Sequence, residues 1–309
     1  MRAIQLTAFG DPSVLVPVDV PDPVPASDQV LVDVERVSIS FVETQIRAGR
    51  PPRAFPLPEP PFIPGNGVGG VVSAVGPGVD PGLVGRRVFA TTGGHGGYAS
   101  KAVAAVSDLV EIPAGISTAD GVALATDGRT ALGLFRLAAP GAGEIVLVES
   151  AAGGVGTLLV QLSLRAGARV IGVSSGGKLN IVKKRTEAID YGQPEWADRV
   201  RELTAGAAVD VVFDGVGGAV GTAAAGLVST AGRFVIHGAA SGSMTDPATV
   251  NARILTLRDI RETVAELSRD ALTSGLSPLV GQVLPLERAA DAHARIEART
   301  AVGKTLLAV

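Results

Sequence analysis

The sequence predicts an α/β protein with two domains, one built on a doubly wound parallel sheet and the other an irregular β-barrel. Two features of the chain lead to this prediction. Of its 20 prolines, 15 stand at or before Pro113, so turns interrupt the first part of the chain far more often than the second. From about residue 120 onward, short β-branched apolar runs alternate with segments of helical periodicity, which is the pattern of a parallel sheet with crossover helices.

In the first part, short β-prone segments are separated by proline and glycine. These segments are 3–8, 29–37, 70–75 and 87–90, and one helix is expected over Phe41 to Ala48. Seven prolines between Pro51 and Pro64 favour an extended surface loop, which either flanks a site or only connects strands.

In the second part, strands and helices are expected in turn. The strands are 145–148, 169–173, 210–213 and 233–236, and the helices are 155–164, 178–186 and 219–227. Two more helices, over 257–273 and 287–298, and a last strand over 304–309 complete the chain.

The composition indicates a globular protein and excludes several classes. Of the 309 residues, 46% are hydrophobic and 18% are charged, which is enough apolar material for two cores and too much for disorder. The net charge is −3 and the one compact cationic run is Lys183 to Arg185, so nucleic acid is not an expected partner. Cysteine is absent, which excludes disulfides and thiolate metal ligands. With no visible signal peptide and no membrane-length apolar run, we expect a soluble, cytoplasmic protein.

A glycine-rich turn stands between the expected strand 145–148 and the expected helix 155–164. Its pattern, Ala151-x-Gly153-x-x-Gly156, is the dinucleotide fingerprint with alanine at the first glycine. Backbone without large side chains can approach a pyrophosphate there, and the N–H groups at a helix N-terminus favour the anion. We therefore expect Gly153, Gly154, Val155 and Gly156 to hold a nucleotide. The alternative is a simple tight turn.

The end of the second strand indicates which dinucleotide binds. An acid about 20 residues beyond the glycines would accept the adenosine ribose hydroxyls, and no acid stands there. Ser174, Ser175 and Lys178 stand there instead, and hydroxyls with an ammonium suit a 2′-phosphate. This favours NADPH over NADH. In the alternative interpretation, the two serines cap the next helix and Lys178 is solvated.

Several motifs together resemble a known family over essentially the whole chain. In order, they are Pro61 to Gly65 with Gly70 to Gly76, Gly97 to Ala99, Ala151 to Gly156 with Gln161, Ala188 to Tyr191, Asp210 to Gly218 and Gly303 to Leu307. As a set they resemble the medium-chain dehydrogenase/reductase superfamily, and within it the zinc-free, zeta-crystallin-like quinone oxidoreductases. The resemblance implies a GroES-like catalytic domain over 1–120, completed by 262–309, and a Rossmann domain over 121–261.

The same resemblance implies roles for individual residues. Matching positions suggest cofactor binding by Thr130, Gly153 to Gly156, Ser174, Lys178, Tyr191, His237, Gly238, Ala239 and Lys304. Tyr191 is equally well explained as a packed aromatic at a strand end. His237 stands where an apolar strand ends, which favours a structural histidine over a catalytic one. The family also implies a homodimer formed through the sheet edge near Arg233 to Ile236.

The chain departs from its relatives at the expected catalytic positions. Zinc-dependent members carry cysteine where Ser40 stands and Gly-His-Glu where Gly65-Asn66-Gly67 stands, so we expect no zinc. Quinone reductases often carry asparagine, aspartate and tyrosine at the positions of Ser40, Glu43 and Gln45, and all three differ here.

The expected reaction is hydride transfer from NADPH to a quinone or an α,β-unsaturated carbonyl. Ser40 would donate to the substrate oxygen and Glu43 would orient Ser40, although Glu43 is equally well explained as the exposed end of a helix. Two alternatives stay open, an enoyl-thioester reductase of lipid or polyketide metabolism and a non-catalytic, NADPH-binding structural or regulatory protein.

Overall fold

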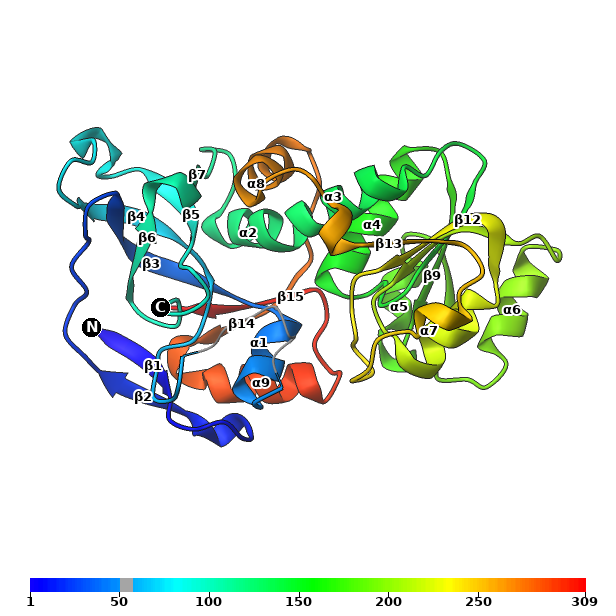
Figure 1. Ribbon diagram of the computed structural model, residues 1–309, viewed down its shortest axis with the longest axis horizontal. Coiled ribbons are helices and arrows are strands. Elements are labelled where there is room, and N and C mark those ends of the chain that lie inside the picture. The colour runs from blue at the N-terminus through cyan, green and yellow to red at the C-terminus, as the bar shows by residue number, and fades with distance from the viewer. Residues whose placement is uncertain (51–57) are drawn as a thin grey trace. The chain divides into compact units, whose positions relative to one another are not determined.

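The computed structural model describes residues 1–50 and 58–309, which form two compact units (Figure 1). One unit contains residues 1–126 and 264–309, and the other contains residues 127–263. The proline-rich loop expected between Pro51 and Pro64 lies partly outside the described residues. No helix of the described residues has the length and apolarity needed to cross a membrane.

The first unit is built on a seven-stranded sheet with the order β14-β15-β3-β4-β5-β7, in which β6 also pairs with β3. Its strands are β3 (Gln29–Ile39), β4 (Gly67–Val75), β5 (Arg87–Thr91), β6 (Lys101–Ala105), β7 (Leu109–Glu111), β14 (Val280–Pro285) and β15 (Lys304–Ala308). A separate pair is formed by β1 (Arg2–Leu6) and β2 (Leu15–Asp19). The helices are α1 (Phe41–Arg47), α2 (Thr118–Ala123), α8 (Val264–Thr273) and α9 (Ala289–Glu297). Strands β2, β6, β7 and β14 are additions to the elements expected from the sequence.

Strand β3 carries the core of this unit. Val30, Val32 and Val34 alternate along the strand and are buried, as one face of a sheet requires. The register shifts between Val34 and Arg36, so the buried positions continue at Val37 and at Ile39 beyond it. Strand β15 pairs antiparallel with the end of β3, with Thr305 opposite Ile39. The C-terminal strand therefore lies beside the entry to α1.

The second unit is a six-stranded parallel sheet with the order β10-β9-β8-β11-β12-β13. Its strands are β8 (Ile145–Val148), β9 (Arg169–Ser174), β10 (Glu187–Asp190), β11 (Val209–Asp214), β12 (Val228–Ile236) and β13 (Arg253–Thr256). Its helices are α3 (Arg129–Ala138), α4 (Gly154–Arg165), α5 (Leu179–Lys183), α6 (Trp196–Leu203) and α7 (Gly218–Ala225). The chain starts in the middle of the sheet, winds outward through β9 and β10, and returns to wind the other way from β11. This is the doubly wound order, so the predicted fold class is confirmed.

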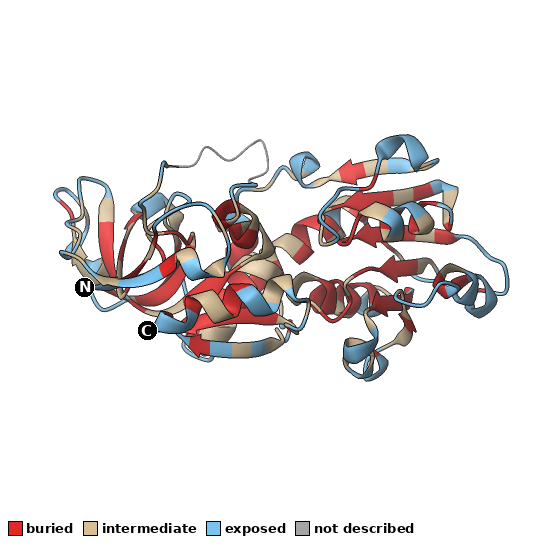
Figure 2. Ribbon diagram, turned by 90° about the horizontal axis from the view of Figure 1, so that it is seen from below, coloured by how far each residue is buried: buried red, intermediate tan, exposed pale blue. Residues whose placement is uncertain are grey.

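Residues at the centre of this sheet are apolar on both faces, because helices cover both faces of a doubly wound sheet. Leu147, Ile171, Val212 and Phe234 have no exposed surface. Figure 2 shows buried residues along the strands of each unit, with exposed residues concentrated in the loops and on the outer helix faces.

Two expectations about the end of this unit are wrong. The segment Arg233–Ile236 is not a sheet edge, because β13 pairs with it in parallel and places Ile254 opposite Phe234. The edge strand is β13 itself. The expected helix over 257–273 begins only at Val264, since Asp259 accepts the Thr256 N–H at 2.8 Å and closes a short turn before it.

Candidate active site

The glycine-rich turn joins β8 to α4 as the dinucleotide fingerprint requires. Gly153 caps the helix, and the first N–H groups of α4 have no acceptor within the helix. A β-carbon at Gly156 would lie 2.3 Å from the Ser150 carbonyl oxygen, and one at Gly154 would lie 1.7 Å from the Asp127 carboxylate. The backbone of Ser150 thus requires glycine at position 156, whereas glycine at position 154 leaves room for the Asp127 side chain, which lies against the first residue of α4. This arrangement fits a phosphate group.

The residues predicted to bind the cofactor in this unit follow the carboxyl ends of neighbouring strands. Because all the strands are parallel, the segments that follow them meet at one edge of the sheet, where open α/β sheets bind ligands. These segments are Ala151–Gly156 after β8, Ser174–Lys178 from the end of β9, Tyr191 after β10 and His237–Ala239 after β12. Thr130 lies on α3, which packs against α4. Their binding roles stay predictions.

A carboxylate from the neighbouring strand lies against the turn after β9, which the sequence did not indicate. Ser174 is buried, and its carbonyl oxygen accepts the Tyr191 N–H at 3.2 Å. The Tyr191 ring packs against the core of the sheet. No acid ends β9, but Asp190 ends the adjacent strand β10, and its carboxylate lies against Gly176. Strand β10 was not expected from the sequence, and recognising it would have placed Asp190 at the same sheet edge.

His237 is neutral and packed into this edge. Its backbone N–H donates to the Asp214 carbonyl oxygen at 2.9 Å, and its ring lies against Gly215. Burial lowers the pKa of His237 to about 4. Its Nε2 atom is buried without a hydrogen-bond partner among the described residues. The imidazole therefore carries no charge at neutral pH, as a structural histidine would.

Two buried carboxyl groups lie where β8 and β11 end. Glu149 Oε2 accepts the Val216 N–H at 3.0 Å, whereas Asp214 accepts the Gly217 N–H at 2.8 Å and the Thr245 hydroxyl at 2.5 Å. Neither side chain has exposed surface. Burial, together with the neighbouring Asp214 carboxylate, raises the pKa of Glu149 well above its ordinary value of 4.5. Sequence reasoning missed this pair, although each acid directly follows or ends an apolar run.

We expect Glu149→Gln to stabilise the second unit increasingly as the pH rises. Above pH 4.5 the unfolded chain releases the Glu149 proton, whereas the folded protein keeps it because its pKa is raised. The free energy of unfolding of the wild type therefore falls as the pH rises from 4.5 towards the pKa of Glu149 in the folded protein. The difference between variant and wild type should grow by up to about 1.4 kcal/mol per pH unit. Trp196, the one tryptophan, is buried in this unit and reports its urea unfolding by fluorescence.

The control for this measurement is Glu202→Gln, because the Glu202 side chain is 61% exposed. Its unfolding curves should follow those of the wild type at every pH. Parallel pH dependence of Glu149→Gln and the wild type would contradict a raised pKa at Glu149.

In the first unit, Ser40 and Glu43 form a hydrogen-bonded pair at the start of α1. Glu43 Oε2 accepts both the Ser40 backbone N–H, at 2.6 Å, and the Ser40 hydroxyl, at 3.0 Å. Glu43 Oε1 accepts the Asn66 N–H at 3.2 Å. The Glu43 side chain is buried, so its interpretation as the exposed end of a helix is wrong. Whether the pair is catalytic stays a prediction.

Burial raises the pKa of Glu43, although the Ser40 hydrogen bonds and the Lys304 charge oppose the shift. Lys304 is buried at the start of β15. The predicted catalytic pair and Lys304 therefore belong to one unit, and the other predicted cofactor residues belong to the second.

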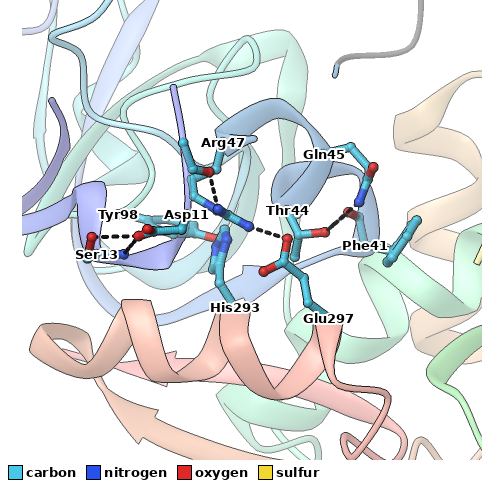
Figure 3. A network of polar contacts seen from close by, with 10 residues as sticks. Asp11, Ser13, Phe41, Thr44, Gln45, Arg47, Tyr98, His293 and Glu297 are labelled. Carbon is cyan, nitrogen blue, oxygen red and sulfur yellow. Dashed lines mark hydrogen bonds and ion pairs between the residues drawn. The ribbon is translucent and has the colours of Figure 1, made fainter. Parts of the chain in front are cut away.

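The same unit contains a buried polar network (Figure 3). The Tyr98 hydroxyl and His293 Nε2 are 2.8 Å apart, and Arg47 forms an ion pair with Glu297 and donates to the Gly10 carbonyl oxygen. Burial and the Glu43 carboxylate raise the pKa of Tyr98 well above 10, and burial lowers that of His293 to about 3. Both rings are therefore neutral at physiological pH.

The positions that match zinc ligands in related enzymes hold side chains that form other hydrogen bonds. Ser40 is engaged with Glu43, and the Asn66 side-chain oxygen accepts the Gly94 N–H at 2.8 Å. Within residues 1–50 and 58–309, no three His, Cys, Asp or Glu side chains gather closely enough to hold a metal ion.

Comparison with known proteins identifies the family. Residues 26–114 match the family described as "Alcohol dehydrogenase GroES-like domain", and residues 184–307 match "Zinc-binding dehydrogenase". A quinone oxidoreductase from Pseudomonas aeruginosa is 33% identical over 99% of this chain and 99% of its own length. The chain belongs to the quinone oxidoreductase family of medium-chain dehydrogenases/reductases.

Further members and neighbours of the quinone oxidoreductase family extend the comparison. A mycobacterial protein solved in complex with NADPH has a TM-score of 0.86 and 33% identity, with full coverage of both chains. A 2-haloacrylate reductase from a Burkholderia species is 30% identical over 92% of this chain and 91% of its own length. The predicted resemblance and the GroES-like and Rossmann architecture are confirmed. Although one matching family is named for zinc, Ser40 and Asn66 offer neither thiolate nor imidazole at the ligand positions.

Proposed function

We propose that this chain is an NADPH-dependent reductase that transfers hydride to a quinone or an α,β-unsaturated carbonyl. One observation carries the proposal. The dinucleotide fingerprint lies between β8 and α4, at the point where the strand order reverses, in a chain of the quinone oxidoreductase family. The complex of the mycobacterial neighbour with NADPH supports the choice of cofactor.

The residues present fit this cofactor. The glycine-lined N-terminus of α4 would hold the pyrophosphate, and Ser175 and Lys178 would hold the 2′-phosphate. When bound, NADPH supplies the hydride. The chain supplies position and electrostatic stabilisation. We assign cofactor binding mainly to residues 127–263 and substrate chemistry to the other unit.

The Ser40–Glu43 pair supplies the donor for the substrate oxygen. With Glu43 ionised, the single Ser40 hydroxyl hydrogen is directed at Glu43 Oε2 and is not available to a substrate. With Glu43 protonated, the carboxyl group donates to the Ser40 oxygen and the Ser40 hydrogen is released towards the substrate. Burial raises the pKa of Glu43 and so favours this arrangement. Negative charge that develops on the substrate oxygen is stabilised by such a donor.

The direct test is a substrate panel assayed with purified protein. Loss of NADPH absorbance should depend on added quinone, enone or 2-haloacrylate, the last chosen because of the Burkholderia relative. Enoyl thioesters in the same panel test the alternative reductase. NADPH binding without turnover of any acceptor would instead support a non-catalytic protein and contradict the proposal.

We expect Lys178→Glu to weaken NADPH binding by about 10- to 100-fold and NADH binding much less, because it places a carboxylate against the 2′-phosphate. Isothermal titration calorimetry with each cofactor measures both affinities. The matched control is Lys183→Glu on α5, because Lys183 is an exposed lysine of the same unit. Equal weakening of both cofactors would show that Lys178 does not bind the phosphate.

A further inference from the structure

Asp190 reaches the turn where the adenosine ribose is expected to bind. It is the last residue of β10, and the parallel register places it opposite Ser174, the last residue of β9. Its carboxylate extends over the turn that follows β9. A β-carbon at Gly176 would lie 2.5 Å from Asp190 Oδ2, so glycine at 176 leaves room for this carboxylate.

The two carboxylate oxygens of Asp190 have different surroundings. Oδ1 accepts the Gly192 N–H at 2.8 Å and so closes a local turn. Oδ2 faces Gly176, which is exposed, and accepts no hydrogen bond from the residues that the structure describes. Asp190 itself is half-buried. The local turn uses only Oδ1. Oδ2 can still accept a hydrogen bond, and it faces the segment 174–178.

Two groups with opposite effects on the choice between NADPH and NADH therefore lie at this segment. The Lys178 ammonium and the serine hydroxyls favour a phosphate group, because they supply positive charge and donors. A carboxylate repels a phosphate but accepts hydrogen bonds from ribose hydroxyls, as the acid of NAD-binding folds does. Here the acid comes from the neighbouring strand instead of the end of the second strand.

We propose that Asp190 is a specificity-determining residue that weakens binding of the 2′-phosphate and strengthens binding of the 2′-hydroxyl. The cofactor preference is then the balance between Lys178 and Asp190. This inference rests on the proposed function, because it places the adenosine ribose of a nicotinamide cofactor at the end of β9.

Asp190→Asn tests the proposal with little change in structure. The asparagine side-chain oxygen can still accept the Gly192 N–H, so the local turn is kept while the charge is removed. We expect the ratio of NADPH to NADH affinity to rise about tenfold, which corresponds to about 1.4 kcal/mol. Calorimetry with 2′,5′-ADP and 5′-AMP, which lack the nicotinamide, should show the same change independently of activity.

Asp80→Asn is the matched control. Asp80 Oδ1 accepts the Gly82 N–H at 2.9 Å, which is the same turn geometry in the other unit. This variant should leave the affinity ratio unchanged. If Asp190→Asn also leaves the ratio within about twofold, or weakens both cofactors equally, the role of Asp190 is overturned while NADPH binding and the proposed function stand. If the wild-type protein binds neither cofactor, both the role of Asp190 and the proposed function fail.

Discussion

Ser40→Ala should lower kcat by about 100- to 1000-fold with a smaller change in KM, the range seen when one oxyanion donor is removed. The substitution removes the hydroxyl that would meet the charge developing on the substrate oxygen. Ground-state binding of the substrate depends on it less, so the loss falls on kcat. Steady-state kinetics with the best quinone or enone of the panel measures the change.

Glu43 variants separate a catalytic pair from a helix cap. Glu43→Gln can accept the Ser40 N–H and donate its amide to the Ser40 oxygen, so it should keep kcat within about tenfold of the wild type. Glu43→Ala should lose as much as Ser40→Ala. In the wild type, kcat should fall as the pH rises through the raised pKa of Glu43, because the donating proton is lost. The glutamine variant should not show this fall.

The control is Ser117→Ala at the start of α2. Ser117 also begins a helix and donates to an acid three residues later, with 2.8 Å between its hydroxyl and Asp120. Its replacement should cost about 1 kcal/mol of stability and leave kcat unchanged. Wild-type kcat in Ser40→Ala would contradict the catalytic role, whatever the stability of the variant.

Glu297→Ala should destabilise the first unit by about 2–3 kcal/mol. This loss is at or just below the lower end of the range for a broken buried ion pair, because the Glu297 side chain is 27% exposed. Its partner Arg47 is only 2% exposed and would be left as an uncompensated buried charge. Arg47 also forms hydrogen bonds with the Gly10 backbone, so the N-terminal segment around Gly10 should become less stable as well. Amide hydrogen exchange in α1 and α9 measures the effect, whereas Trp196 fluorescence of the second unit should not change.

Two further variants make this result specific to the buried pair. Glu202→Ala removes an ion pair with Arg199 in which both side chains are more than 60% exposed, and should cost at most about 0.5 kcal/mol. The double variant Arg47→Met with Glu297→Gln should recover part of the lost stability, because no unpaired charge stays buried. Equal losses in Glu297→Ala and Glu202→Ala would show that burial does not govern this pair.

The elements with strong local signals were predicted well. Strand Ile145–Val148 and the helix after it match the expected ranges closely, because β-branched residues, a glycine turn and helical periodicity are all local properties. Short strands such as β10 and β13 were missed. Each has four residues that mix polar with apolar side chains, so each lacks the continuous apolar run that marks the equally short strand Ile145–Val148.

The sequence by itself determined the fold class, the family resemblance, the glycine-rich turn before α4 and the absence of thiolate ligands, because each depends on residue type and spacing along the chain. Only the tertiary structure decided which charged groups meet. It placed Asp190 beside Gly176, Glu149 near Asp214 and Arg47 against Glu297, and it buried the Glu43 side chain that accepts the Ser40 hydroxyl. Most of these contacts join residues far apart in sequence, and strand order and helix packing bring them together without any local signal.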